Sequence, residues 1–109
     1  MILSRNKYNA LKCEYKGIKF DSKKERNRYL ELEILVLARE IRNLETHPRF
    51  DLMVNGQKIG RYTADFRYLT SAGDTIVEDV KSKATKTRDY VLRKKILATY
   101  VPPIYITEV

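Results

Sequence analysis

Residues 58–81, KIGRYTADFRYLTSAGDTIVEDVK, contain the two stretches that decide the fold. Apolar and polar side chains interleave through 58–69 and again through 75–81, which is the pattern of half-buried β-strands. Between them, residues 70–74 read TSAGD, a run of turn-forming residues. We therefore expect an antiparallel pair of strands, with Asp65 in the middle of the first strand, where aspartate is uncommon.

The face that carries Asp65 is predicted to be a polar site. Residues two apart in a strand share a face, so Asp79 and Lys81 lie together and Glu78 points the other way. Asp65 can lie beside Asp79 across the antiparallel pair. Neighbouring carboxylates stay ionised together only with a cation between them; otherwise one of them protonates. Mg²⁺ binds such oxygens and keeps water molecules, one of which can act as a nucleophile, so the pattern is typical of phosphodiester hydrolysis.

Helices are predicted on either side of the strand pair in the sequence. Ser22 and Glu25 form an S-x-x-E capping box at the start of a helix, and Thr87 can cap a second one. Asn55-Gly56 is a strong hairpin signal. The expected elements are a hairpin (12–15 with 18–20), a helix (22–42), three strands (49–54, 58–69 and 75–81), a helix (88–101) and a strand (104–108).

This order predicts an α/β fold with a mixed α+β sheet. The last strand follows a helix, as in a crossover connection, so it should pair in parallel with an earlier strand. The 109 residues allow one domain, which we place at residues 1–109. On the first long strand, the side chains expected to face the core are Tyr62, Ala64, Phe66 and Tyr68.

The charge of the chain indicates a polyanionic partner. The sequence has 22 Lys and Arg against 14 Asp and Glu, for a net charge of +8. The surplus lies in residues 1–28 and 81–95, and nucleic acid is the first candidate. The one cysteine, Cys13, excludes a disulfide within the chain, and no apolar run has the length of a transmembrane helix. We therefore expect a cytoplasmic protein with no membrane partner.

Four stretches of the chain resemble the PD-(D/E)XK nuclease superfamily, and within it small phage proteins similar to junction-resolving endonucleases: KYNALKCEYKGIKFDSKKE, YTADFRYL, VEDVKSKATKT and ITEV. The resemblance implies a restriction-endonuclease-like core in the order α-β-β-β-α-β, with the basic N-terminal hairpin as an extension. It matches Asp65 and Asp79 to the two acids of the motif and Lys81 to its lysine. Glu25 matches the acid that many members carry on the first helix.

Two departures from the superfamily pattern concern the acids. Ala64 precedes Asp65 where proline is usual, and Asp79 stands where glutamate is commoner. A bulge in that strand would turn Glu78 into the site instead. The alternation of side chains along the strand favours Asp79.

The resemblance implies a Mg²⁺-dependent DNA endonuclease. Asp65, Asp79 and the backbone carbonyl of Val80 would hold one or two Mg²⁺ ions, and Mn²⁺ would substitute. Lys81 would position the attacking water, and Glu25 would bind a second ion or a water on the metal. The residues expected to contact DNA are Lys23, Lys24, Lys83, Thr85, Lys86, Arg88 and Lys94.

The expected substrate is branched DNA, such as a Holliday junction, in phage recombination, replication or packaging. Shape and phosphate contacts would select it, and cutting a junction needs two active sites, hence a homodimer. The alternatives are a non-catalytic nucleic-acid-binding protein that keeps the nuclease fold, and a phage protein that acts on a host factor. Single residues also have simpler explanations: Glu25 as a helix cap, Asp65 as an ion-pair partner of Arg61 or Arg67, and His47 as a loop residue.

Overall fold

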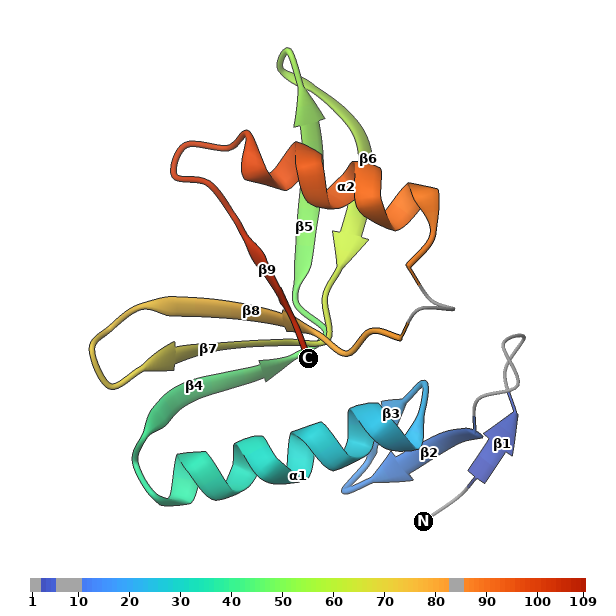
Figure 1. The fold of residues 1–109 in the computed structure, drawn as a ribbon, viewed down its shortest axis with the longest axis vertical. Coiled ribbons are helices and arrows are strands. Elements are labelled where there is room, and N and C mark those ends of the chain that lie inside the picture. Colours follow the sequence, from blue (N-terminus) through green and yellow to red (C-terminus); the bar gives the residue numbers. More distant parts are fainter. Residues whose placement is uncertain (1–2, 6–10, 83–85) are drawn as a thin grey trace. The chain divides into compact units, whose positions relative to one another are not determined.

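The structure is a computed structural model that describes residues 3–5, 11–82 and 86–109. The chain divides into two compact units, residues 1–40 and residues 41–109. We call them the N-terminal unit and the C-terminal unit (Figure 1). Across the described ranges, no helix combines the length and the apolar character that crossing a membrane requires.

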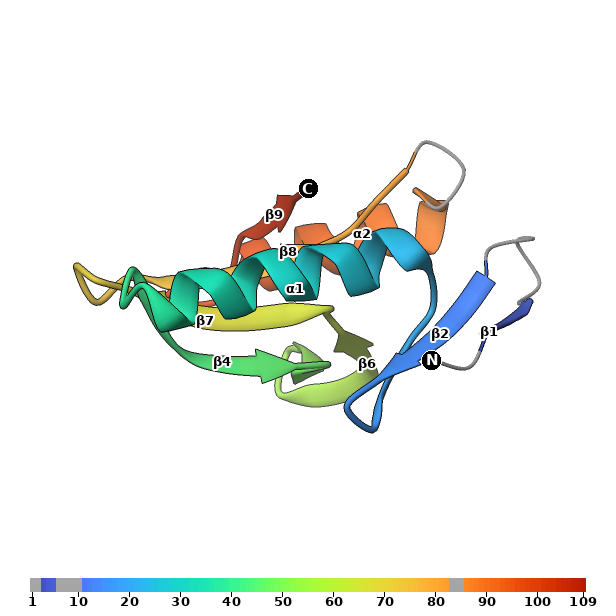
Figure 2. The ribbon, with the colours of Figure 1, turned by 90° about the horizontal axis from the view of Figure 1, so that it is seen from below.

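The N-terminal unit is a three-stranded antiparallel sheet with a helix packed against two of its strands (Figure 2). The predicted hairpin is confirmed, and Lys16 and Gly17 form its turn with φ of 52° and 78°. Both residues thus have the positive φ that two-residue hairpin turns of type I′ require. The elements of this unit are β1 (Leu3–Arg5), β2 (Leu11–Tyr15), β3 (Ile18–Phe20) and α1 (Lys23–Leu37).

Helix α1 begins at the predicted capping box. The Oγ atom of Ser22 accepts a hydrogen bond of 3.1 Å from the backbone N–H of Glu25. The Glu25 carboxylate in turn accepts from the backbone N–H of Asp21 at 3.3 Å. Both bonds satisfy backbone donors around the start of the helix, where the N–H groups of the first turn have no partner inside it.

The predicted end of this helix, residue 42, was wrong. Helix α1 ends at Leu37, and Arg39 adopts the left-handed φ of 61° that often ends helices. The reason lies in the next element, because Ile41 is buried and pairs with Thr70 in a sheet. That pairing outweighs the helical preference of Ala38, Arg39 and Glu40, which are good helix formers.

The C-terminal unit is built on a four-stranded mixed sheet with the strand order β4-β7-β8-β9. The first three strands are antiparallel, whereas β9 runs parallel to β8 after the helix α2, as predicted for the last strand. From α1 onward, and setting aside a hairpin, the chain order is helix, three strands, helix, strand, so the predicted α/β class with a mixed sheet is confirmed. These elements are β4 (Ile41–Thr46), β7 (Phe66–Thr70), β8 (Thr75–Asp79), α2 (Arg88–Ala98) and β9 (Ile106–Glu108).

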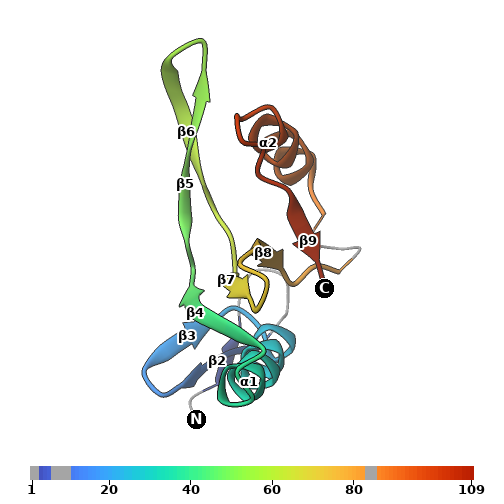
Figure 3. The same ribbon diagram turned by 90° about the vertical axis from the view of Figure 1, so that its left-hand side faces the viewer.

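The long strand predicted over residues 58–69 is in fact two strands. It is β6 (Gln57–Thr63) followed by β7, and β6 pairs with β5 (Arg49–Val54) in a separate two-stranded sheet (Figure 3). The change of partner occurs at two residues: Ala64 donates its N–H to Pro48, whereas Asp65 donates to the carbonyl of Glu78. The alternation of polar and apolar residues over 58–69 does not reveal this switch, because β6 and β7 each keep one polar and one apolar face.

The main hydrophobic cluster of the C-terminal unit lies where α2 packs against β5 and the sheet. Val77 and Ile106, which are register partners on β8 and β9, belong to it. All four side chains of the predicted core face are buried, so that prediction is confirmed; Tyr62 and Ala64 join this cluster, whereas Phe66 and Tyr68 are buried outside it. The whole cluster is Leu52, Tyr62, Ala64, Val77, Tyr90, Leu97 and Ile106.

Tyr100 links the end of α2 to an irregularity in the hairpin. The register of β5 and β6 shifts between Leu52 and Met53. The Tyr100 hydroxyl accepts from the N–H of Met53 at 2.8 Å and donates to the carbonyl of Asp51. We expect Tyr100→Phe to lower the free energy of unfolding by about 1 kcal/mol, because both backbone groups lose this partner.

Urea unfolding of the two proteins measures this effect. Tyr105→Phe is the matched control, since Tyr105 is 70% exposed and should change stability by less than about 0.5 kcal/mol. Equal effects of the two substitutions would show that the Tyr100 hydroxyl does not stabilise the irregular pair.

Candidate active site

The centre of the candidate site is a reciprocal contact between Asp65 and Asp79. The backbone N–H of Asp65 donates to Oδ1 of Asp79 at 2.9 Å, and the backbone N–H of Val80 donates to Oδ2 of Asp65 at 2.7 Å. The Asp79 carboxylate is therefore oriented by the backbone of Asp65, and the Asp65 carboxylate by the backbone of Val80, the residue after Asp79. The two predicted acids lie side by side on neighbouring segments, with Asp79 only 1% exposed.

Glu78 lies on the opposite face of β8 and does not join this pair. It is the register partner of Phe66, and its carboxylate accepts a hydrogen bond from the Tyr68 hydroxyl. β8 keeps regular pairing with β7 from Thr75 to Glu78, so the bulge that would have turned Glu78 into the site is not seen there. The alternation argument for Asp79 is thus consistent with the side-chain positions.

A third carboxylate, Glu108, lies next to Asp79 in the sheet. The two residues are register partners in the parallel pair of β8 and β9. Backbone pairing continues beyond the strand ends: Val109 donates to Asp79 at 3.0 Å, and Lys81 donates to Val109 at 3.2 Å. The site therefore combines two acids predicted from the sequence, the predicted lysine and an acid that was not predicted.

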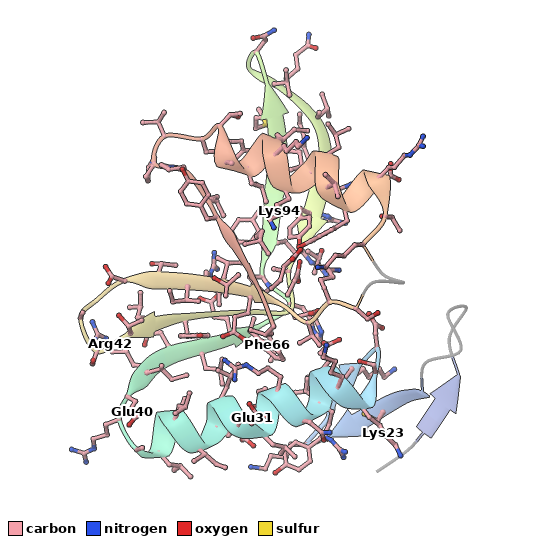
Figure 4. All side chains as sticks on the ribbon, viewed as in Figure 1. Lys23, Glu31, Glu40, Arg42, Phe66 and Lys94 are labelled. Atoms are coloured by element: carbon pink, nitrogen blue, oxygen red, sulfur yellow. The ribbon has the colours of Figure 1, made fainter. Side chains whose placement is uncertain are left out.

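Tyr90 of α2 bonds to this third acid. Its hydroxyl donates to Oε2 of Glu108 at 2.7 Å, and the ammonium groups of Lys86 and Lys94 lie 3.1 Å and 3.4 Å from Glu108 oxygens. The Tyr90 bond, followed by that of Lys86, lowers the pKa of the Glu108 carboxyl from 4.5 to about 2. Figure 4 labels Lys94 on α2.

Burial raises the pKa of Tyr90, and the hydrogen bond to Glu108 adds to this effect. The negative charges of Asp79 and Asp65 raise it further. The Tyr90 hydroxyl therefore stays a hydrogen-bond donor, and it experiences the field of the acidic pair. This connects the Glu108 cluster to Asp65 and Asp79 electrostatically.

The lowered pKa of Glu108 predicts a pH-dependent contribution to stability. Because its folded pKa is below the unfolded value, ionised Glu108 stabilises the fold above about pH 4.5, and this contribution is lost as the pH falls towards 2. We expect the stability difference between the wild type and Glu108→Gln to shrink over that interval in urea titrations. The exposed Glu40 is the control, and Glu40→Gln should give a smaller change. A difference for Glu108→Gln that stays constant with pH would contradict the prediction.

Lys81 reaches the same cluster through the ring of Tyr90. Its Nζ atom lies 4.4 Å from the ring centre, within the range of a cation–π contact. The Nζ atom of Lys94 is 6.0 Å from the same ring. Tyr90 thus contacts the predicted lysine with its face and Glu108 with its hydroxyl.

His47 is close to Asp65 although the sequence indicated only a loop residue. Its backbone N–H donates to the carbonyl of Asp65 at 2.9 Å, and a ring nitrogen lies within 4.8 Å of an Asp65 carboxylate oxygen. Its φ is 54°, an uncommon left-handed conformation for a residue before proline. His47 and Asp65 are side chains of the types that bind metal ions, so this unit could in principle hold one.

The other predicted residues are distributed over both units. Glu25, Lys23 and Lys24 belong to the N-terminal unit, where Glu25 is buried and both lysines are exposed. Glu25 stays a predicted metal ligand, and the two lysines stay predicted DNA contacts. Arg88 is exposed at the first position of α2. Lys83 and Thr85 lie outside the described residues.

Sequence reasoning missed Tyr90, Glu108 and His47 as site residues. A local signal existed for the first of these, because Tyr90 and Lys94 are spaced four apart in the predicted helix and thus lie on one side of it. Glu108 had no such signal, since its place beside Asp79 depends on the register of a parallel strand pair. His47 reaches Asp65 through a backbone contact that links residues 18 positions apart in the chain.

Comparisons with known proteins give one result. A family model with the description "Protein of unknown function (DUF1064)" matches residues 5–107. No curated protein and no solved structure matches the chain. The match carries no activity with it, and the resemblance to PD-(D/E)XK nucleases stays a prediction.

Proposed function

The chain belongs to the DUF1064 family of proteins of unknown function, and we propose that it is an endonuclease that hydrolyses phosphodiester bonds in DNA with Mg²⁺. The reciprocal contact of Asp65 and Asp79 is the observation that carries the proposal. This contact orients two carboxylates on one side of the sheet. One of them, Asp79, lies two residues before Lys81 in the chain. Groups oriented in advance stabilise developing charge without a reorganisation cost during the reaction.

The residues suit a hard divalent cation. The carboxylate oxygens of Asp65 and Asp79 are the donors that Mg²⁺ prefers, and the backbone carbonyl of Val80 is a further proposed ligand. Asp79 is almost fully buried, where an ionised carboxylate favours a cation beside it. When bound, the ion would supply positive charge to the reacting phosphate. His47 adds an imidazole nitrogen close to Asp65. Mn²⁺ takes the same carboxylate and carbonyl oxygens as Mg²⁺, so Mn²⁺ is proposed to substitute.

Lys81 is proposed to act on the substrate. Its ammonium group lies over the Tyr90 ring and carries the charge needed to orient an attacking water or to neutralise a phosphate oxygen. Lys86, Arg88 and Lys94 precede or belong to α2 and are proposed to contact the DNA backbone. Such phosphate contacts are independent of sequence, which supports selection of the target by its shape.

The proposed substrate is branched DNA, cut by a homodimer in the cytoplasm. A cleavage assay tests the proposal with supercoiled plasmid, linear duplex and a four-way junction, each with Mg²⁺, Mn²⁺ or EDTA. We expect cutting that requires the metal and is strongest on the junction. Gel shifts without cutting under any metal would support the non-catalytic nucleic-acid-binding alternative. If the protein neither cuts DNA nor binds it in a salt-sensitive way, both the nuclease proposal and the nucleic-acid-binding alternative are overturned.

A further inference from the structure

A groove in the C-terminal unit lies along α2 and the approach to β9. It has a volume of about 310 Å³ and combines apolar walls with a basic edge. Val91, Ala98 and Tyr105 supply apolar surface, and Tyr90 also lines the groove. Lys86, Lys94 and Lys95 supply the positive charge.

The exposed ring of Tyr105 is the most unusual feature of the groove. Tyr105 is 70% exposed, whereas its neighbour Ile106 is buried in the cluster beneath α2. Val91, on the helix side, is also exposed at 42%. A flat aromatic surface and an aliphatic side chain thus line one hollow that is open to solvent.

The lysines of the groove differ in how they are held. Lys86 and Lys94 are ion-paired to Glu108, a carboxylate that also lines the groove. Lys95 is exposed and forms no ion pair with any residue in the described part of the chain. The net charge of the groove is therefore positive, and Lys95 is available to an anionic ligand.

The groove also shares Tyr90 and Glu108 with the candidate active site. Tyr90 lines the groove, and the Nζ atom of Lys81 lies 4.4 Å from the centre of its ring. A second hollow of about 320 Å³ shares Lys86, Val91 and Lys95 with the groove. A chain of linked anionic units therefore has room for more than one unit along α2.

We propose that this groove binds an unpaired nucleotide of a nucleic acid strand, with the base against Tyr105 and the phosphate at Lys95. Stacking on an aromatic side chain beside a basic groove is how single strands are bound without sequence preference. A nucleotide matches both surfaces, because it joins a flat apolar base to an anionic phosphate. An acidic peptide would match the lysines, but it lacks a base that would use the exposed ring.

The inference deepens the proposed function by naming the substrate class, DNA with an unpaired strand, and its link to cleavage rests on that function. Binding itself is measured without cleavage. Fluorescence anisotropy with a labelled six-nucleotide single strand is recorded in EDTA for the wild type, Tyr105→Ala and Tyr105→Phe. We expect roughly tenfold weaker binding for Tyr105→Ala and near wild-type binding for Tyr105→Phe.

Two controls separate stacking from charge and from folding. Ile59→Ala removes another exposed apolar side chain, 57% exposed and outside the groove, and should leave binding unchanged. Lys95→Gln should reduce the salt dependence of binding by about one counterion. Circular dichroism confirms that each variant is folded.

Equal affinity of Tyr105→Ala and the wild type would overturn the proposal, as would tighter binding of an acidic hexapeptide than of the oligonucleotide. The wild type, tested in both the binding and the cleavage assay, separates the two claims. If its strand binding depends on Tyr105 but it cuts no DNA with any metal, the nuclease proposal fails and the groove proposal stands. If the protein cuts DNA with metal but its strand binding does not depend on Tyr105, the nuclease proposal stands and the groove proposal fails.

Discussion

Asp79→Asn is expected to lower metal-dependent DNA cleavage by about 10²- to 10³-fold, the usual cost of removing one charge-stabilising group from an active site. Asparagine keeps an oxygen that accepts from the N–H of Asp65, which is the 2.9 Å bond seen in the wild type. The substitution therefore removes the negative charge while preserving the local geometry. Initial rates on junction DNA with Mg²⁺ and Mn²⁺ measure the effect.

Glu78→Gln is the matched control on the same strand. Glu78 is as buried as Asp79, but its carboxylate bonds to Tyr68 on the other face of β8. Glutamine can still accept that bond, so cleavage should stay within about threefold of the wild type, whatever happens to stability. A larger loss in Glu78→Gln than in Asp79→Asn would mean that the acids have been assigned to the wrong faces.

Metal binding gives a readout that does not depend on cleavage. Removing one of two neighbouring carboxylates relieves their repulsion, so Asp79→Asn without metal should be at least as stable as the wild type. Only the wild type should then show a rise in Tm when Mg²⁺ or Mn²⁺ is added. Equal rises in both proteins would place the metal at other residues.

Leu97→Ala is expected to lower the free energy of unfolding of the C-terminal unit by about 2–5 kcal/mol. Leu97 is fully buried in the cluster that includes Val77 and Ile106, so the truncation removes apolar contacts and leaves a cavity. Chemical denaturation followed by circular dichroism measures the change. The loss is large relative to the 5–15 kcal/mol that typically separates folded and unfolded domains.

Leu92→Ala is the control on the same helix. Leu92 is 58% exposed, and its truncation should change stability by less than about 0.5 kcal/mol. The pair also tests the site, because α2 carries Tyr90. If Leu97→Ala cost no more than Leu92→Ala, the helix would not be packed on the sheet as described.

The two central acids could be predicted from the sequence because strand geometry is local. Side chains alternate faces along any extended strand, so Asp79 and Glu78 are separated whatever the rest of the fold does. The turn over residues 70–74 joins the strands of Asp65 and Asp79 and brings these acids together. The helix caps could be predicted for the same reason. The side-chain oxygens of Ser22 and Thr87 each accept a hydrogen bond from the backbone N–H three residues ahead.

The strands around the acids were harder to predict. β4 occupies residues expected to be helix end and loop, and it is a strand because it pairs with β7, whose register partners lie 20 to 29 residues further along the chain. The division of residues 58–69 into β6 and β7 likewise depends on partners, Pro48 for Ala64 and Glu78 for Asp65. Pairing energies between distant segments are absent from any local pattern, which explains both errors.

The sequence by itself determined the mixed α/β class, the helix starts, the hairpin turns and the face on which Asp65, Asp79 and Lys81 lie. Each of these follows from backbone geometry over a few residues. Only the tertiary structure decided that Tyr90 of α2 and Glu108 of β9 meet beside Asp79. The physical reason is that a parallel strand register and the packing of a helix on a sheet bring together side chains that no short-range spacing relates.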